Sequence, residues 1–144
     1  IIPTKPFPVV VNSIIYPVAL LSNSTVSGFY FSQSSKEIGF SVTGLLNKTG
    51  FCNITIPLSL MWCSQLQEWQ VKVNGDGPIY FPTPTSNGTH TFLYFTYNHT
   101  ANTIRIISTE VIPEFPMVVI LPLFIIITLV TAVLRKVRKE TSES

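Results

Sequence analysis

An uninterrupted apolar segment near the carboxyl end, Met117–Leu134, constrains the fold of this 144-residue chain more than any other feature. Its 18 residues (MVVILPLFIIITLVTAVL) include no charged side chain. A helix of that length is about 27 Å long, close to the roughly 30 Å hydrocarbon core of a bilayer. Because only Thr128 and Thr131 are polar, the segment lacks the polar face of a helix that packs on a soluble core. We therefore expect one transmembrane helix, kinked at Pro122.

The charges on either side of this segment predict its orientation. A basic cluster follows it directly and consists of Arg135, Lys136, Arg138 and Lys139. The preceding residues, 111–116, include no basic side chain. Basic flanks stay in the cytoplasm, where they also lie against anionic lipid headgroups. We therefore expect a single-pass protein of the cell membrane, partnered by the lipid bilayer, with its carboxyl end in the cytoplasm and residues 1–116 outside.

Short alternating segments dominate the region that precedes the apolar segment. Ile38–Val42 and Phe51–Ile56 place an apolar side chain at every second position, which is the period of a half-buried strand. Asn74–Gly77 (NGDG) is a hairpin signal, with Pro78–Phe81 returning after it. Thr91–Tyr97 is apolar on both faces and predicts a central strand. Seven or eight such strands predict a mainly β fold, an immunoglobulin-like β-sandwich, with a barrel as the alternative.

The same patterns divide the chain into five regions. They are a Pro-rich extended lead-in that becomes either a linker or an edge strand (1–13), an extracellular β-sandwich (14–112), a juxtamembrane PEFP linker (113–116), the transmembrane helix (117–134) and the basic cytoplasmic tail (135–144). The chain begins with Ile1 and shows no signal peptide. We interpret it as either a processed mature chain or the carboxyl-terminal part of a larger protein.

Asn-x-Ser/Thr sequons are more frequent than composition explains, because about two are expected by chance. The five are at Asn23, Asn47, Asn53, Asn87 and Asn98. Four of them fall in predicted turns, and Asn53 falls on the outward face of its predicted strand. This placement predicts N-linked glycosylation on the outside of the membrane.

Cys52 and Cys63 are the only cysteines. In an extracellular domain such a pair predicts a disulfide, worth roughly 3 kcal/mol for a loop of about a dozen residues. Two free buried thiols are the alternative. His90 and His99 lie at opposite ends of one predicted strand, about 30 Å apart if it is straight. We interpret both as surface turn residues and expect no metal site.

The sequence offers little for catalysis or nucleic-acid binding. Asp76 is the only aspartate and lies in a predicted turn, and no GxSxG, HExxH or phosphate-loop motif occurs. Acidic and basic side chains balance in residues 1–116, so no basic face is available for nucleic acid. We therefore expect no enzyme activity, no cofactor and no nucleic-acid partner.

Several segments resemble the carboxyl-terminal region of archaeal cell-surface proteins. VIPEFP at Val111–Pro116, the apolar segment and the basic cluster resemble a PEF-type sorting or anchor region. The β-domain that precedes such anchors is resembled by Gly50–Pro57, Trp69–Val73, Tyr94–His99 and the pair Ile106 and Ile107. The resemblance covers about residues 38–139.

This resemblance implies a glycosylated archaeal surface protein, often large and multi-domain, that is tied to the membrane or the surface layer. Its implied partners are surface-layer or neighbouring surface proteins. In some members an archaeosortase cuts near the motif, here Pro113, Glu114 and Phe115, and a lipid replaces the helix. The tail continues past the basic cluster to Ser144 and is longer than a minimal sorting signal. A permanent anchor and a cleaved one are therefore both open.

From these features we predict a non-enzymatic, membrane-anchored cell-surface module, serving as a stalk, a display domain or a structural part of the cell envelope. One alternative is an adhesin-like or solute-binding ectodomain that uses loops at one end of the sandwich. Another is the membrane foot of an enzyme whose catalytic domain lies upstream. The fold by itself does not decide among them.

Overall fold

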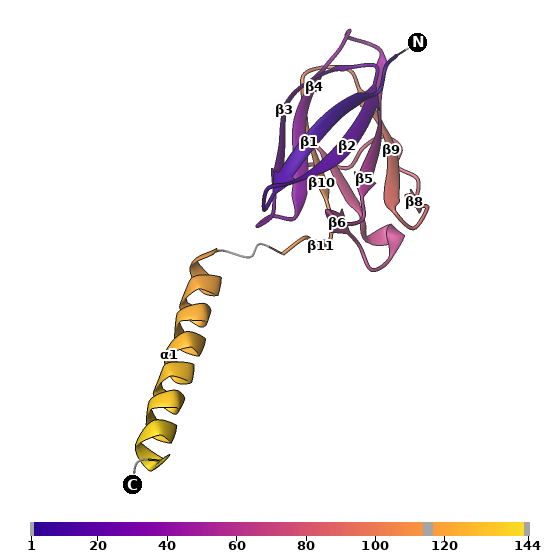
Figure 1. Cartoon of the computed structure of the whole chain (residues 1–144). Coiled ribbons are helices and arrows are strands. Elements are labelled where there is room, and N and C mark those ends of the chain that lie inside the picture. Colours follow the sequence, from indigo (N-terminus) through magenta and orange to yellow (C-terminus); the bar gives the residue numbers. More distant parts are fainter. Residues whose placement is uncertain (1, 114–116, 143–144) are drawn as a thin grey trace. The chain divides into compact units, whose positions relative to one another are not determined.

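The computed structural model describes residues 2–113 and 117–142, with side chains of the C-terminal helix described at 125–139. The chain divides into two compact units, Ile1–Pro113 and Glu114–Ser144. The first unit consists of β-strands in two layers, and the second contains one helix (Figure 1).

The regular secondary structure of the first unit is almost entirely strand. Its elements are β1 (Lys5–Val11), β2 (Ile14–Ser22), β3 (Thr25–Ser32), β4 (Glu37–Thr43), β5 (Thr49–Pro57), β6 (Met61–Trp62), the 3₁₀ turn η1 (Leu66–Glu68), β7 (Gln70–Val73), β8 (Thr85–Ser86), β9 (His90–Asn98), β10 (Asn102–Ile107) and β11 (Glu110–Val111). Antiparallel pairing joins them into a five-stranded sheet (β1-β2-β5-β9-β8), a four-stranded sheet (β3-β4-β10-β7) and the small pair β11-β6. Residues 5–107 thus form two open sheets and not the closed barrel that the strand pattern also allowed.

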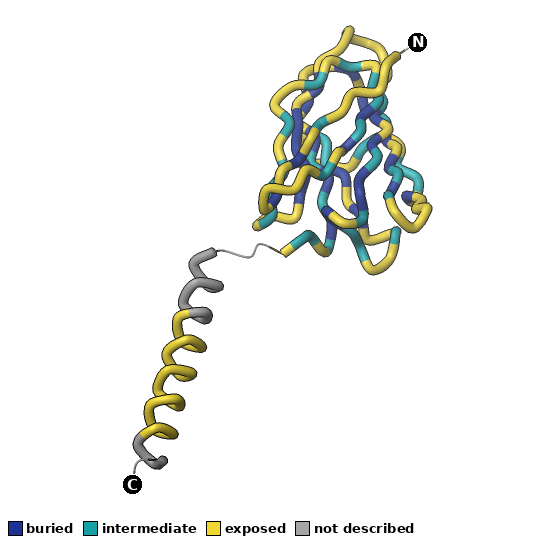
Figure 2. The backbone as a smooth tube through the Cα atoms, viewed as in Figure 1, coloured by how far each residue is buried: buried dark blue, intermediate teal, exposed yellow. Residues whose placement is uncertain are grey.

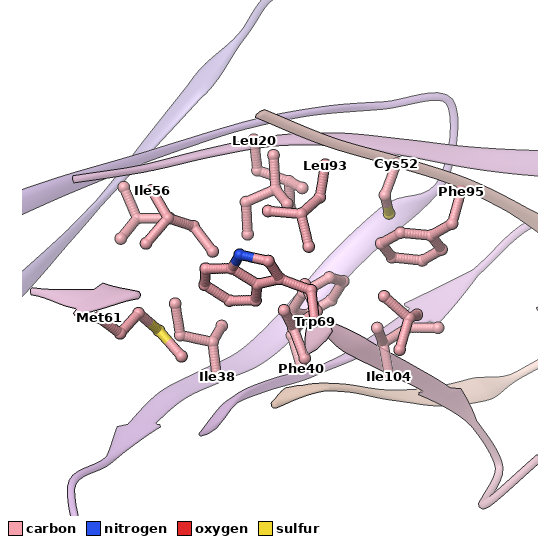
Figure 3. Packing of buried hydrophobic residues seen from close by; sticks show 14 of the residues in the cluster. Leu20, Ile38, Phe40, Cys52, Ile56, Met61, Trp69, Leu93, Phe95 and Ile104 are labelled. Carbon is pink, nitrogen blue, oxygen red and sulfur yellow. The ribbon is translucent and has the colours of Figure 1, made fainter. Parts of the chain in front are cut away.

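The core lies between the two larger sheets. Buried and exposed positions alternate along β5 and β9 because successive side chains of a strand point to opposite faces (Figure 2). Trp69 lies at the centre, between Leu93 of one sheet and Phe40 of the other (Figure 3). Each fully buried apolar side chain of this kind stabilises the fold by about 1.5–3 kcal/mol. The mainly β prediction is confirmed.

The Pro-rich lead-in takes its edge-strand alternative, because residues 5–11 form the outermost strand of the five-stranded sheet. β1 and β2 are joined by a two-residue turn in which Asn12 and Ser13 both have positive φ. Such a turn matches the twist of a hairpin. The five-stranded sheet therefore begins at Lys5, within the segment that was predicted as a lead-in.

Two local predictions have different outcomes. The turn at Asn74–Gly77 is confirmed, because the Val73 N–H donates to the Asp76 carbonyl at 2.7 Å and Asn74 and Gly75 have positive φ. The return of Pro78–Phe81 along β7 is wrong. The Ile79 N–H instead donates to the Thr96 carbonyl at 2.9 Å, so this segment borders β9. A local turn signal carries no information about that long-range partner.

The helix α1 (Met117–Ser142) has 26 residues, so it extends through the basic cluster that was predicted as a separate tail. The side chains at 125–139 are exposed. Within the described part of the chain, no helix combines the length and the apolarity needed to cross a bilayer. The predicted span 117–134 includes positions 117–124, whose side chains lie outside those described.

Candidate functional site

All five sequon asparagines are exposed on the β-sandwich, although their local bonding differs. The Asn23 amide braces two strands, because its Nδ2 donates to the Thr49 carbonyl and its Oδ1 accepts the Phe51 N–H. Asn87 accepts three hydrogen bonds from Thr89 and His90. The remaining three are Asn47, Asn53 and Asn98, whose side-chain amides have no hydrogen-bond partner among the described residues.

The outer face of the five-stranded sheet carries Asn53 among aromatic side chains. Phe51 and Tyr94 stack with their ring centroids 6.1 Å apart, and Tyr80 meets Tyr94 edge-on at 6.4 Å. Asn53 and Tyr94 are direct cross-strand partners between β5 and β9. We call Phe51, Tyr80 and Tyr94 the aromatic platform. β9 is central in its sheet as predicted, yet its outer face is open to solvent, with Tyr94 39% exposed.

The predicted disulfide is not formed, because Cys52 and Cys63 are both free thiols in the structure. Cys52 points into the core from β5, beside Phe95 and far from Met61 in Figure 3. Cys63 follows β6 in a different sheet, where its sulfur accepts the Thr109 N–H at 3.4 Å. The short spacing of the two cysteines in the sequence does not reveal this separation. Between them the chain leaves one sheet and enters another.

A polar network closes the core at the end of the sandwich that carries the β2–β3 turn. The Ser24 hydroxyl lies 2.6 Å from the Tyr97 hydroxyl and 2.8 Å from Nε2 of His99. The Tyr97 hydroxyl also lies 3.6 Å from Sγ of Cys52 and 3.4 Å from the Ser22 hydroxyl. Burial raises the pKa of the Cys52 thiol to about 11 and raises the pKa of the Tyr97 phenol further still.

His99 corrects the interpretation of both histidines as surface residues. Only 5% of His99 is exposed, whereas His90 is half-buried and accepts or donates a bond to the Thr89 hydroxyl at 2.9 Å. The inward series of β9, which includes Phe95 and Tyr97, reaches His99 in the next step of two residues. Continuing the period-two pattern past the apolar residues would have placed His99 inside, but its polarity suggested a turn.

The Ser24–His99 distance is that of a nucleophile and its general base. In serine hydrolases a third polar group orients the base through its other ring nitrogen. Here Nδ1 of His99 is buried and has no partner among the described residues. The Ser24 hydroxyl is also held by Tyr97. The network therefore lacks the orienting group of a triad and instead fastens the β2–β3 turn to the core.

Two shallow hollows flank this network. One has a volume of about 340 Å³ and includes Ser22 and Ser24 in its lining. The other has a volume of about 330 Å³ and is lined by Asn23, Leu45, Lys48, Thr49 and His99. In the part of the chain that the structure describes, no cluster of three or more His, Cys, Asp or Glu side chains is arranged to hold a metal ion.

The anchor and sorting residues are only partly described. Pro113 is exposed and ends the first unit, whereas Glu114 and Phe115 lie outside the described residues. The basic cluster, Arg135, Lys136, Arg138 and Lys139, lies on the last turns of α1 and is exposed. Its spacing of three and four residues places Arg135, Arg138 and Lys139 on one side of the helix.

No family model matches this chain, and neither the curated proteins nor the solved structures with which it was compared include a significant match.

Proposed function

We propose that the chain is a non-enzymatic, membrane-anchored module of an archaeal cell surface, which holds its β-sandwich outside the membrane as a stalk or display domain. The observation that carries the proposal is the division at Pro113. Before it lies a β-sandwich with five exposed sequon asparagines, and after it lies a helix that contains the uncharged segment Met117–Leu134. The basic cluster that follows supports a cytoplasmic carboxyl end.

The shape of the sandwich supports a display role. Its connections β2–β3 and β4–β5 cross from one sheet to the other, as in immunoglobulin-like sandwiches, and we infer an immunoglobulin-like domain. Sandwich domains of this kind occur in many cell-surface proteins, and their loops cluster at the two ends of the sandwich. Surface-layer or neighbouring surface proteins are the proposed partners, and the archaeal origin and the sorting role of Pro113, Glu114 and Phe115 rest on the resemblance alone.

A second candidate is an adhesin-like or solute-binding ectodomain. The β4–β5 loop presents Leu45 and Leu46, which are 77% and 70% exposed. Leu45 also lines the hollow that reaches His99. Exposed apolar side chains that adjoin one another are candidates for a contact surface. This observation favours binding at the end of the sandwich and is compatible with the anchor.

Membrane extraction tests the first proposal. Washing membranes of the producing cell with alkaline carbonate is expected to leave the full chain in the pellet. The double variant Ile126→Arg, Val130→Arg is expected in the supernatant, because each charge at the centre of a membrane helix costs about 2.5–3.5 kcal/mol. The matched control Ile126→Leu, Val130→Leu should remain in the pellet. Release of the unmodified chain by the wash would refute the anchor.

The intact mass of the extracted protein separates the two kinds of anchor. A mass that includes the residues up to Ser144 means that the helix is the permanent anchor. A carboxyl end near Phe115 with an added lipid means that the helix is a sorting signal that has been removed. A chain with neither a helix nor a lipid would contradict membrane anchoring.

A further inference from the structure

The aromatic platform is unusual for the place it occupies. The outer face of an antiparallel sheet is normally polar, because water covers it. Here Tyr80 and Tyr94 are 57% and 39% exposed, and the neighbouring Ile79 is 60% exposed. Phe51 and Phe92 are half-buried beside them on the same face. Neighbouring exposed apolar side chains, unlike scattered single ones, are candidates for a contact surface.

Asn53 lies at the edge of this platform. Successive outward residues on β5 are Phe51, Asn53 and Thr55, so the sequon and its preceding aromatic ring share one face. Tyr94 stands directly opposite Asn53 on β9, at a separation of about 4.5–5.5 Å between Cβ atoms for such partners. The Asn53 amide has no hydrogen-bond partner in the described structure. Its Nδ2 is therefore available and is next to two rings.

The other sequons have different surroundings. Asn98 also lies on the outer face of the five-stranded sheet, but its cross-strand partner is Thr49 and its outward neighbour along β9 is Thr96. Asn23 is occupied in bracing β5. Asn87 lies in the turn that precedes β9, and its side chain accepts hydrogen bonds from Thr89 of that turn and from His90, the first residue of β9. Among the sequons of the described chain, Asn53 is the one paired with an aromatic residue of the platform.

We propose that Asn53 carries an N-linked glycan whose first sugar packs on Phe51 and Tyr94. A pyranose ring has an apolar face of C–H groups, which complements the electron-rich face of an aromatic ring, and a polar edge that stays in water. Modification joins the sugar's anomeric carbon to Nδ2 of Asn53. The bond from that carbon to the phosphate of a lipid-linked sugar donor breaks, the lipid phosphate leaves with the electron pair, and the amide proton is lost to a base of the transferring enzyme. The occupant is thus covalently attached beside its own binding surface.

This inference rests on the proposed function, because the modification requires exposure of the sandwich on the outer side of the membrane. It adds that one glycan is structural. The glycan at Asn53 covers aromatic surface and stabilises the sandwich, whereas a glycan at Asn98 extends into solvent.

A double-mutant cycle on the full-length chain, purified in detergent from a glycosylating archaeal host, tests the inference. Glycopeptide mass spectrometry first measures occupancy at each sequon, and thermal unfolding is then followed by fluorescence of the buried Trp69. Asn53→Gln is expected to lower the melting temperature by about 3–5 °C. In a Tyr94→Ser background the same substitution should have a clearly smaller effect, because the sugar has lost one of its two rings. The matched control Asn98→Gln should leave the melting temperature unchanged.

Further arms separate the glycan from the side chain it replaces. Thr55→Val destroys the sequon but keeps Asn53, and it is expected to reproduce the loss seen with Asn53→Gln. In protein made by a host without N-glycosylation, neither substitution should change the melting temperature. If Tyr94→Ser does not fold, Thr55→Val compared between the two hosts still decides the question.

The outcomes that overturn the inference differ from those that overturn the proposed function. An unmodified Asn53 beside an occupied Asn87 or Asn98 refutes the inference and leaves the surface module intact. An occupied Asn53 whose loss has no effect on unfolding also refutes it and assigns the platform to another occupant, such as a free saccharide or a protein. A chain with no modified sequon that is also washed from membranes refutes both.

Discussion

His99 and the two glycines around it determine how side chains pack at one end of the sandwich. The His99 ring occupies space that side chains at Gly44 and Gly50 would need, since a Cβ built at Gly50 lies 2.6 Å from Cδ2 of the ring. Gly50 is also the cross-strand partner of Tyr97. Both glycines are therefore required by close packing around the polar network. The network in turn connects the β2–β3 turn with β5 and β9.

Substituting Gly50 tests this packing. Gly50→Ala forces the Tyr97 and His99 rings to move, and we expect the free energy of unfolding to fall by about 1–3 kcal/mol, as for other overpacked sites. Urea unfolding measures the change. Gly77→Ala is the matched control, because no atom lies within 4 Å of its Cβ position, and a change below about 0.5 kcal/mol is expected. Equal effects for the two variants would contradict the packing.

Cys52 predicts a dependence of stability on alkaline pH. Burial raises the pKa of its thiol from 9.0 to about 11, so the folded chain holds this proton more tightly than the unfolded chain. The stabilisation is complete below pH 9 and is lost as the pH rises toward 11. The expected slope is about 1.4 kcal/mol per pH unit in that range. Urea unfolding at pH 8, 9 and 10 measures it.

The variant Cys52→Ala separates this thiol from the other groups that titrate in the same range. Burial also raises the pKa of Cys63 and Tyr97, so a part of the slope remains in the variant. We expect the Cys52→Ala slope to be clearly smaller than that of the unmodified chain, whatever its absolute stability. Identical slopes for the unmodified chain and for Cys52→Ala would show that folding does not raise the pKa of the Cys52 thiol.

At the scale of elements, β1 shows how an edge strand is protected from pairing with another chain. The two-residue turn makes Val11 and Ile14 a hydrogen-bonded pair, so alternation makes Pro8 and Pro17 a pair without mutual bonds. The nitrogen of Pro8, and that of Pro6 two residues earlier, therefore faces the open edge. Neither residue offers an N–H there, and this removes donors that another strand would use.

Restoring those donors tests the protection. Pro6→Thr combined with Pro8→Thr returns two N–H groups to the open edge, and we expect the variant to self-associate in detergent at concentrations where the unmodified chain stays monomeric. Sedimentation velocity measures the association. Val10→Thr changes an exposed side chain of the same strand without adding a backbone N–H donor and should behave like the unmodified chain. Association of the control to the same extent would assign the effect to the side chains.

The strands that the sequence predicted well are those with one face in the core. Every second side chain of Phe51–Ile56 is buried in β5 as predicted, and the apolar side chains of Ile38–Val42 are buried in β4 as predicted. Gly39 of β4 is buried as well, because the Tyr30 side chain lies over it. The failures concern relations that a local pattern cannot encode. Pro78–Phe81 borders a strand that follows it later in the chain, and Cys63 follows a strand of a different sheet from the one that contains Cys52.

The candidate sites show the same difference between local sequence patterns and long-range contacts. The sequons could be predicted because a sequon is a local motif. The outward position of Asn53 followed from the alternation of side chains along its predicted strand. The aromatic platform was not readable, because Tyr80 reaches Tyr94 only through the pairing of its segment with Thr96. The polar network was missed because Ser22, Ser24 and His99 each resemble ordinary turn residues in the sequence.

At the scale of the whole molecule, the chain separates a β-sandwich from a helix of different composition. The sandwich presents polar asparagines and an aromatic platform, whereas the helix combines an apolar segment with a basic end. The proposed function requires this separation, since it assigns one part to the outside and the other to the membrane and the cytoplasm. The proposed function therefore places the sandwich and the basic cluster on opposite sides of a membrane.

Lysine labelling of intact cells measures that sidedness directly. Lys5 and Lys48 are exposed on the sandwich, and Lys136 and Lys139 belong to the basic cluster. A membrane-impermeant amine reagent is expected to modify Lys5 and Lys48 on intact cells and to reach Lys136 and Lys139 only after the membrane is permeabilised. Labelling of the basic cluster on intact cells, or protection of Lys5 and Lys48 until permeabilisation, would contradict a sandwich held outside a membrane by its C-terminal helix.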